Sequence, residues 1–141
     1  MEKKCYITTY AREQLVQAEL TSFIATLNRT EPDLATSAQI QKALSCIHAH
    51  LFDPNLNVAF VCRQCGLYNH NVSSHFKRAV GMGMRRYIQT QRLEAAKCLL
   101  QYEALCILNI AWSVGFTHPE SFARAFKRYE GCTATQFRAR V

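Results

Sequence analysis

The stretch ILNIAWSVGFTHPESFARAFKRYEG, residues 107–131, is a second version of an earlier stretch, VAFVCRQCGLYNHNVSSHFKRAVG, residues 58–81. The ending Phe-Lys-Arg-x-x-Gly recurs after 50 residues, and an apolar pattern that ends in glycine recurs after 49 residues. A repeat of this kind indicates one supersecondary unit that occurs twice. Each copy has a short amphipathic pattern, a glycine and a second amphipathic pattern. The sequence therefore predicts two helix-turn-helix units.

Gly66 and Gly115 are the residues at which the first helix of each unit is expected to end. Glycine adopts positive φ without steric cost, as a sharp turn after a helix requires. A small residue four positions before each glycine lets the second helix cross close to the first. An apolar residue after each glycine fills the corner between them. This is the geometry in which the second helix of a unit can enter the major groove of DNA.

The rest of the chain is predicted to be helical as well. Only 5 glycines and 3 prolines occur, which disfavours a turn-rich β fold. One amphipathic helix is expected over Tyr10–Asn28, and the stretch RTEPDLATS after it is expected to be a linker. Thr36 and Gln39 have the spacing of a capping box, and Asn57 is a candidate N-cap. A long helix over Met84–Gln101 would join the two units. The predicted fold class is therefore all-α.

The two parts of the chain differ in charge. Residues 1–55 have a balance of −1 and residues 56–141 a balance of +8, for a net charge of +7. A basic segment of this kind suggests a polyanion as partner, and nucleic acid is the commonest. The chain has no long apolar run and no signal-peptide pattern, so we expect no membrane partner and a cytoplasmic location.

The stretch Cys62-x-x-Cys65, followed by His70 and His75, is similar to the ligand run of a zinc knuckle. Both cysteines fall on the apolar stripe of the predicted helix, and the second copy has small apolar residues in their places. The two histidines point about 140° apart on a helix. The odd count of seven cysteines also argues against a disulfide framework. We therefore expect no metal and no cofactor, although a metal- or thiol-responsive regulator that uses Cys62 and Cys65 remains an alternative.

Residues 37–141 resemble the DNA-binding domain of AraC/XylS-type transcription regulators. The second copy has the family pattern I-x-x-I-A-x-x-V-G-F, then F-x-R-x-F-K-[RK], then G-x-[ST]-P-x-x-[FY]-R, except that Ala134 stands where proline is usual. The linker YIQTQRLEAAKCLL matches Y-[IL]-x-x-x-R-[LI]-x-x-A-x-x-L-L, with Arg92 in place.

The resemblance implies a seven-helix domain with two helix-turn-helix units on a long helix. Its implied bounds are 36–141, with units at about 57–80 and 106–130 and the linker helix at about 84–101. It implies binding to double-stranded DNA in successive major-groove segments, as a bacterial transcription regulator that contacts RNA polymerase. Residues 1–35 are too few for the effector-binding β-barrel of other family members. Their helix is expected to pack on the domain, to form a dimer or to dock a partner.

The candidate DNA-contacting residues lie on the two predicted recognition helices. Arg124 is the best candidate for bidentate contact with guanine, and Glu120 can accept from cytosine N4 or merely favour the helix N-terminus. The first unit departs more from the family, since Ser74 stands where arginine is usual. The base-reading candidates are Asn69, His70, Asn71, Ser73, Ser74, His118, Glu120, Ser121 and Arg124. The phosphate candidates are Lys77, Arg78, Arg85, Arg86, Lys127 and Arg128, with an Arg128–Glu130 ion pair as the alternative for Arg128.

Besides the metal- or thiol-responsive regulator, one other function is compatible with the sequence. A degenerate first unit would suit a protein-interaction module that binds another regulator instead of DNA. An enzyme is not expected, because we find no nucleophile-base arrangement, phosphate-binding glycine loop or paired-carboxylate motif in the sequence. Phe76, Phe122 and Phe126 are expected to be core residues that pack the recognition helices onto their partners.

Overall fold

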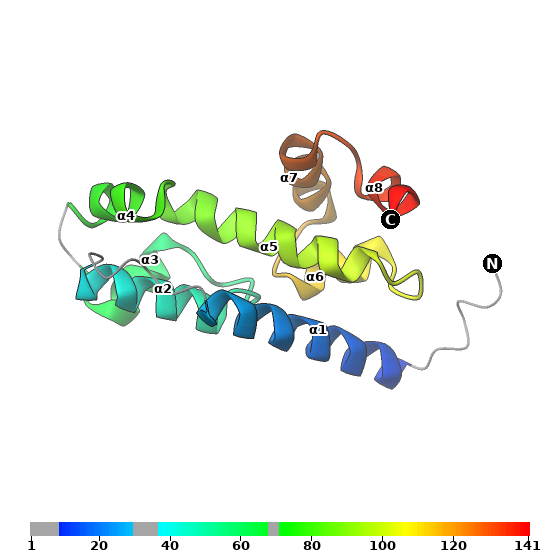
Figure 1. Ribbon diagram of the computed structural model, residues 1–141, viewed down its shortest axis with the longest axis horizontal. Coiled ribbons are helices and arrows are strands. Elements are labelled where there is room, and N and C mark those ends of the chain that lie inside the picture. Colours follow the sequence, from blue (N-terminus) through cyan, green and yellow to red (C-terminus); the bar gives the residue numbers. More distant parts are fainter. Residues whose placement is uncertain (1–8, 30–36, 68–70) are drawn as a thin grey trace.

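The computed structural model describes residues 9–29, 37–67 and 71–141, which form helices and no strand (Figure 1). This part of the chain is all-α, as predicted. The helices are α1 (Thr9–Arg29), α2 (Ala38–His50), α3 (Val58–Cys65), α4 (Val72–Val80), α5 (Met84–Leu100), α6 (Ile107–Ser113), α7 (Pro119–Glu130) and α8 (Ala134–Arg140). None of them is both long enough and apolar enough to cross a membrane.

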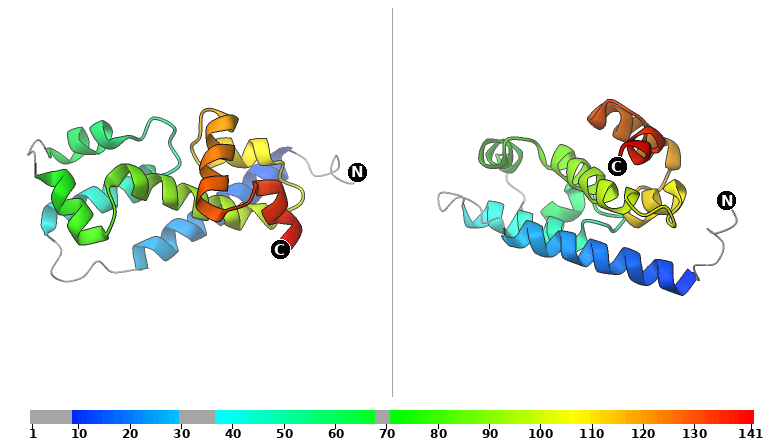
Figure 2. Two further views of the ribbon diagram at one scale, coloured as in Figure 1. Left: turned by 90° about the horizontal axis from the view of Figure 1, so that it is seen from above. Right: turned by 45° about the vertical axis from the view of Figure 1, so that its right-hand side comes forward.

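The repeated units form two lobes at opposite ends of α5 (Figures 1 and 2). Helices α2, α3 and α4 make the first lobe, and α6, α7 and α8 make the second. Each lobe has its own hydrophobic core, and residues of α5 contribute to both. The predicted core phenylalanines Phe76, Phe122 and Phe126 are all buried. Helix α5 is therefore the shared spine on which the two units are mounted.

Helix α1 runs beside α5 and packs against both lobes (Figure 1). Leu20 is buried in the second core, whereas Ile24 and Leu27 pack against the first. Phe23 packs against both cores. Of the three roles considered for this helix, the structure shows packing on the domain.

His48 joins α2 to two other helices. Its Nδ1 lies 3.0 Å from Asn28 Oδ1 in α1, and its Nε2 lies 2.6 Å from the Tyr87 hydroxyl in α5. Burial lowers the pKa of this imidazole below its ordinary value of 6.5. The side chain of Tyr87 is also buried, which raises the pKa of its phenol to about 12. Burial therefore favours the neutral form of both groups.

The helix starts agree with the sequence at one position and differ at another. Asn57 caps α3 as predicted, since its side chain accepts a hydrogen bond from the Phe60 N–H. Helix α2 begins at Ala38 with Ser37 as its N-cap, because the Ser37 hydroxyl accepts from the Ile40 N–H. The capping box predicted on Thr36 and Gln39 is therefore wrong as the start of α2. Thr36 itself and the rest of the predicted linker from residue 30 lie outside the described residues.

Candidate nucleic-acid interface

The second helix-turn-helix unit presents α7 as an amphipathic helix. The helix starts with Pro119, whose fixed φ suits the first helical position. One face carries the buried Phe122, Ala125 and Phe126. Arg124 is exposed on the side opposite Phe122 and Phe126, given 100° per residue. The solvent-exposed face of α7 is therefore polar, and Arg124 lies near the middle of that face.

The turn before α7 fixes the angle at which the helix leaves the unit. Gly115 has a φ of +105°, a conformation that side chains rarely adopt. The Phe116 N–H bonds the Ala111 carbonyl at 3.0 Å, which closes the end of α6. The Phe116 ring then packs edge-on against Phe122, with centroids 5.4 Å apart. This corner makes α7 cross α6 and leaves the polar face of α7 exposed to solvent.

The first unit repeats this arrangement with a shorter second helix. Gly66 has a φ of +65°, and its positive value was predicted like that of Gly115. Val72 and Phe76 are buried on the inner face of α4, and Ser74 is exposed on the outer face. The helix begins only at Val72, so Asn71 precedes it instead of lying within it as predicted. The residues before Asn71 in the predicted recognition helix, 68–70, lie outside the described residues.

The structure brings most predicted base-reading residues to exposed positions on these two helices or beside them. Asn69 and His70 lie outside the described residues. The predicted base-reading residues that are described and exposed are Asn71, Ser73, Ser74, His118, Glu120, Ser121 and Arg124.

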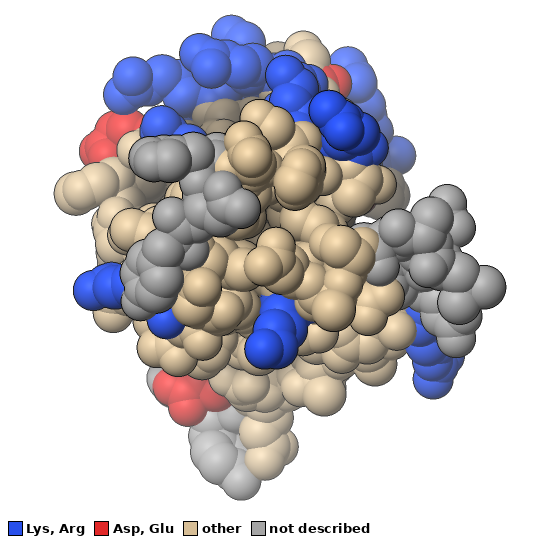
Figure 3. All heavy atoms as spheres, turned by 90° about the vertical axis from the view of Figure 1, so that its left-hand side faces the viewer, with Lys and Arg blue, Asp and Glu red and all other residues tan. Residues whose placement is uncertain are grey.

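The predicted phosphate-binding cations are exposed too. Figure 3 shows Lys and Arg side chains gathered along the edge on which Figure 1 places α7, with few acidic side chains among them. Within the described ranges, none of these six cations takes part in an ion pair. The exposed cations are Lys77, Arg78, Arg85, Arg86, Lys127 and Arg128.

Glu130, at the end of α7, has a partner other than the predicted one. Its carboxylate lies 2.7 Å from Lys97 Nζ of α5, and Glu94 lies 3.5 Å from the same amine. The hydrogen bond to Glu130 is the main reason why the pKa of Lys97 is raised. The neighbouring Tyr129 hydroxyl donates to Glu94. The alternative Arg128–Glu130 pair is therefore wrong, and α7 is tied to the linker helix.

Two arginines that the sequence did not mark as structural hold the loops before each unit. Arg92 of α5 donates from Nε to the Leu51 carbonyl at 2.8 Å and from Nη2 to the Asp53 carbonyl at 2.7 Å. Arg138 of α8 donates to the carbonyls of Leu100, Tyr102 and Leu105. The available sequence signal was that both positions match an arginine in the family patterns quoted above. These contacts anchor both units to the spine.

Cys62 and Cys65 are half-buried and pack against the first core, as their place on the apolar stripe predicted. The neighbour of Cys65 is Cys46 of α2. Burial, with Cys65 nearby, raises the pKa of the Cys46 thiol to about 11. The Cys65 Sγ also lies 3.5 Å from the Lys42 carbonyl. In the described part of the chain, no three His, Cys, Asp or Glu side chains are grouped as a metal site would need.

Comparison with known proteins connects this geometry to a family. A protein-family model described as a helix-turn-helix domain matches residues 61–140. The C-terminal domain of AraT, a response regulator from Geobacillus stearothermophilus, is 26% identical with a TM-score of 0.71, over 76% of this chain and 88% of that domain. The C-terminal domain of the response regulator yesN from Fusobacterium nucleatum is 27% identical with a TM-score of 0.67, over 72% of this chain and 99% of that domain.

Curated relatives show the same similarity over part of their length. The arabinose operon regulatory protein of Escherichia coli is 30% identical over 101 residues, which are 72% of this chain and 35% of that protein. The Msm operon regulatory protein of Streptococcus mutans is 26% identical over 140 residues, which are 94% of this chain and 50% of that protein. The chain thus spans about a third to a half of the length of these relatives.

Proposed function

The chain belongs to the AraC-type helix-turn-helix family, and from this premise we propose that it regulates transcription by binding double-stranded DNA with α4 and α7. One observation supports this proposal above the others. Each helix keeps its apolar face in a lobe core and turns a polar face with exposed Lys-Arg pairs outward. A helix of this kind fits the major groove, where side chains read base edges.

In the second unit, we assign base reading to the outward face of α7. Arg124 is exposed and forms no ion pair with another described residue. Its guanidinium suits a bidentate contact with guanine O6 and N7. Glu120 and Ser121 flank it one turn earlier, and His118 precedes the helix. Among these, Glu120 would accept from cytosine N4.

In the first unit, we assign base reading to the short face of α4. Ser73 and Ser74 are exposed there, and Asn71 lies just before the helix. Asn69 and His70 complete the predicted set. Because Ser74 occupies the place that Arg124 has in the second copy, this unit offers shorter side chains to DNA. We therefore expect it to discriminate less between bases than the second unit.

The six exposed cations would bind phosphates. Lys77 and Arg78 lie in the last turn of α4, and Lys127 and Arg128 lie in the last turn of α7. Arg85 and Arg86 lie in the first turn of α5, beside the first unit. Such contacts supply salt-dependent affinity without sequence information. RNA polymerase is a further partner by family resemblance.

Dimerisation through α1 is the weaker part of the partner prediction. The apolar side chains of α1 pack against both cores. A helix whose apolar stripe is already buried has little apolar surface to offer to a second copy. We therefore propose that this domain binds DNA as a monomer.

Selection of bound duplexes from a random pool tests the proposed function. We expect two motifs whose centres are about 34 Å apart, one helical turn, with the stronger motif under α7. Enrichment of one motif alone would show that α4 does not read bases. Absence of any enrichment, with weak and salt-independent binding to random DNA, would favour the protein-interaction module.

A gain-of-contact variant tests which helix reads which motif. Ser74→Arg places on α4 the side chain that α7 has at Arg124. We expect the weaker motif to gain one fixed G·C pair in the selected pool. Ala79→Arg, on the other side of the same helix, is the matched control and is expected to leave the motif unchanged.

A further inference from the structure

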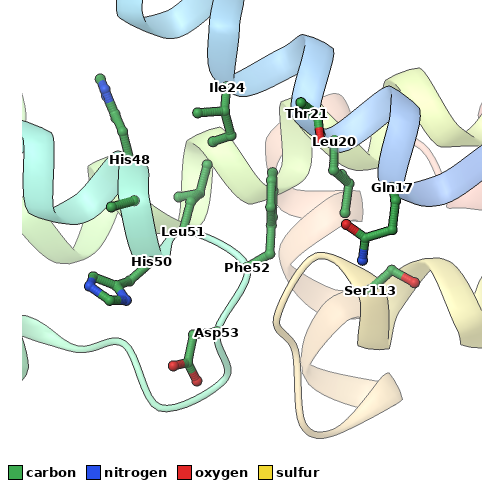
Figure 4. Close-up of a pocket in the computed structure, with 11 residues that line it drawn as sticks. Gln17, Leu20, Thr21, Ile24, His48, His50, Leu51, Phe52, Asp53 and Ser113 are labelled. Carbon is green, nitrogen blue, oxygen red and sulfur yellow. The ribbon is translucent and has the colours of Figure 1, made fainter. Parts of the chain in front are cut away.

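The two cores meet at the loop after α2, around Phe52. Phe52 packs against both hydrophobic cores, as does Phe23 of α1, and their rings lie 6.3 Å apart. Figure 4 shows Phe52 between Leu51 and Leu20, with Ser113 of the second unit across the pocket. This open pocket is about 580 Å³ and is lined by α1, by the end of α2 with its loop, and by Ser113. The first and second units thus come together at this loop.

Arg92 holds the same loop from the spine. Its two hydrogen bonds end on the carbonyls of Leu51 and Asp53, on either side of Phe52. These carbonyls follow the last turn of α2, where a helix leaves acceptors without internal partners. The guanidinium is partly buried, and burial lowers the pKa of Arg92. The orientation of the first unit relative to α5 is therefore fixed in part by this side chain.

The Arg92 guanidinium also lies against the turn of the second unit. A Cβ placed on Gly115 would lie 2.8 Å from Arg92 Nε, 3.0 Å from Cζ and 3.2 Å from Nη2. The guanidinium therefore fills the space that a side chain at position 115 would need. A long side chain can usually move away from such a clash, but here two hydrogen bonds to backbone carbonyls hold it.

The matching glycine of the first unit has no such neighbour. Gly66 also has positive φ, yet a Cβ built there would meet nothing within 4 Å. Both glycines are needed for the turn, but only Gly115 also leaves room for a side chain from another element. The contact is thus specific to the junction between the units and is not a general property of the repeated turn.

We propose that Arg92, seated against Gly115, is a positioning residue that sets the orientation of α4 relative to α7 and thereby the preferred spacing between the two DNA motifs. This inference rests on the proposed function. Rotation of one unit about the junction would stretch the hydrogen bonds from Arg92 to the carbonyls or press its guanidinium against Gly115. A rotation of roughly 10° midway between helices about 34 Å apart moves each of them by about 3 Å, close to one base-pair step.

The first measurement compares spacing preference on DNA. The selected site is tested beside versions with one base pair inserted or deleted between the motifs. We expect the natural chain to prefer the selected spacing by about tenfold or more. Gly115→Ala should reduce this ratio to about threefold or less, or move the preference to another spacing. Gly66→Ala, which has the same turn position but open space, should keep the natural ratio.

The second measurement needs no DNA. Residual dipolar couplings of backbone amides report the angle between α4 and α7 in solution. In Gly115→Ala we expect that angle to change, or the couplings to be averaged by motion between several angles. In Gly66→Ala we expect the angle to stay unchanged.

If Gly115→Ala does not fold, Arg92→Lys takes its place. Lysine keeps the charge but has no planar fork to bind both carbonyls. Arg140→Lys is its control, because Arg140 lies at an exposed position of α8. Arg92→Lys should relax the spacing preference, and Arg140→Lys should not.

The outcomes separate this inference from the proposed function. If the folded variants at positions 115 and 92 keep the natural spacing preference and the natural inter-helix angle, Arg92 is not a positioning residue. If the natural chain selects no pair of motifs, the two-helix form of the proposed function fails, and the dipolar couplings alone decide on Arg92. An unchanged angle would then overturn the inference.

Discussion

Arg92 and Arg138 bind equivalent carbonyl groups in the loops that precede the two repeated units. The Nε of Arg92 bonds Leu51 and that of Arg138 bonds Leu100, and these leucines are 49 residues apart, as are the units. The two arginines are only 46 residues apart. Both copies must satisfy the acceptors at the end of the helix before the unit. The arginines that do so differ by about one helical turn in their position relative to the repeat.

Loss of Arg138 should destabilise the second unit. Arg138→Ala removes three hydrogen bonds between a charged donor and loop carbonyls. We expect the free energy of unfolding to fall by about 3 kcal/mol. Urea unfolding followed by circular dichroism measures this change. Arg140→Ala, an exposed position on the same helix, should change stability by no more than about 0.5 kcal/mol. Equal effects of the two variants would contradict the role of Arg138.

Helix α1 should behave as a part of the domain core. Leu20 is 7% exposed and packed in the second core, so Leu20→Ala should cost about 2–5 kcal/mol of unfolding free energy. Leu108→Ala is the control, because Leu108 is 42% exposed. The unfolding midpoint should also be independent of protein concentration. A midpoint that rises with concentration would show instead that α1 joins two copies.

Arg124 should carry sequence discrimination. Arg124→Ala is expected to weaken binding to the selected site by roughly 1–3 kcal/mol and to flatten preference at one base pair. Arg128→Ala, on the same helix, should weaken binding to all sequences alike. Fluorescence anisotropy with the selected site and its single-base variants measures both. Equal losses of Arg124→Ala on every duplex would make Arg124 a phosphate contact.

The proposed phosphate contacts should appear in the salt dependence of binding. Each phosphate contact contributes about 0.9 to the slope of log K against log salt concentration. Lys77→Ala and Lys127→Ala should each reduce that slope by about 1 while leaving base preference intact. Lys42→Ala, at an exposed position of α2 outside the proposed interface, should leave the slope unchanged. If none of these variants changes the slope, DNA binds a surface other than the one proposed.

Stability should fall in mild acid because of His48. Burial lowers the pKa of this imidazole in the folded chain, so the unfolded chain binds the proton more readily. The free energy of unfolding is therefore expected to decrease as the pH falls below about 6.5. Protonation would leave Nδ1 donating to Asn28 and would make Nε2 a donor toward the Tyr87 hydroxyl.

Urea unfolding at a series of pH values tests this expectation. His48→Gln should be less stable near neutral pH and should show a smaller decrease toward acid. His75→Gln, at an exposed position on α4, should follow the natural chain. Identical pH profiles for all three proteins would show that His48 does not control acid stability.

Local features of the fold were predictable from the sequence. Asn57 was identified as a cap because a side chain bonds an amide three residues later. The positive φ of Gly66 and Gly115 followed from their place after a short helix. The burial of Phe122 and Phe126 followed from helical periodicity. Each of these depends on neighbours within one or two turns of helix.

Features with several local solutions were predicted less well. Thr36 and Ser37 both suit a helix start, and Ser37 is the N-cap of α2. Glu130 had Arg128 within reach along the chain, but Lys97 of another helix binds it. The start of α4 at Val72 leaves Asn71 outside the helix. Only for Glu130 is the deciding partner a residue of another helix.

The sequence by itself determined that the chain contains two helix-turn-helix units on a helical spine, because repeated spacing and helical periodicity are written in the side chains. Only the tertiary structure decided that α1 bridges both cores and that Arg92 lies between the loop at Leu51 and the turn at Gly115. The physical reason is the nature of the partners. Arg92 and Arg138 bind backbone carbonyls 33 to 41 residues away. Every residue has such a carbonyl, so no sequence pattern marks the ones that are bound.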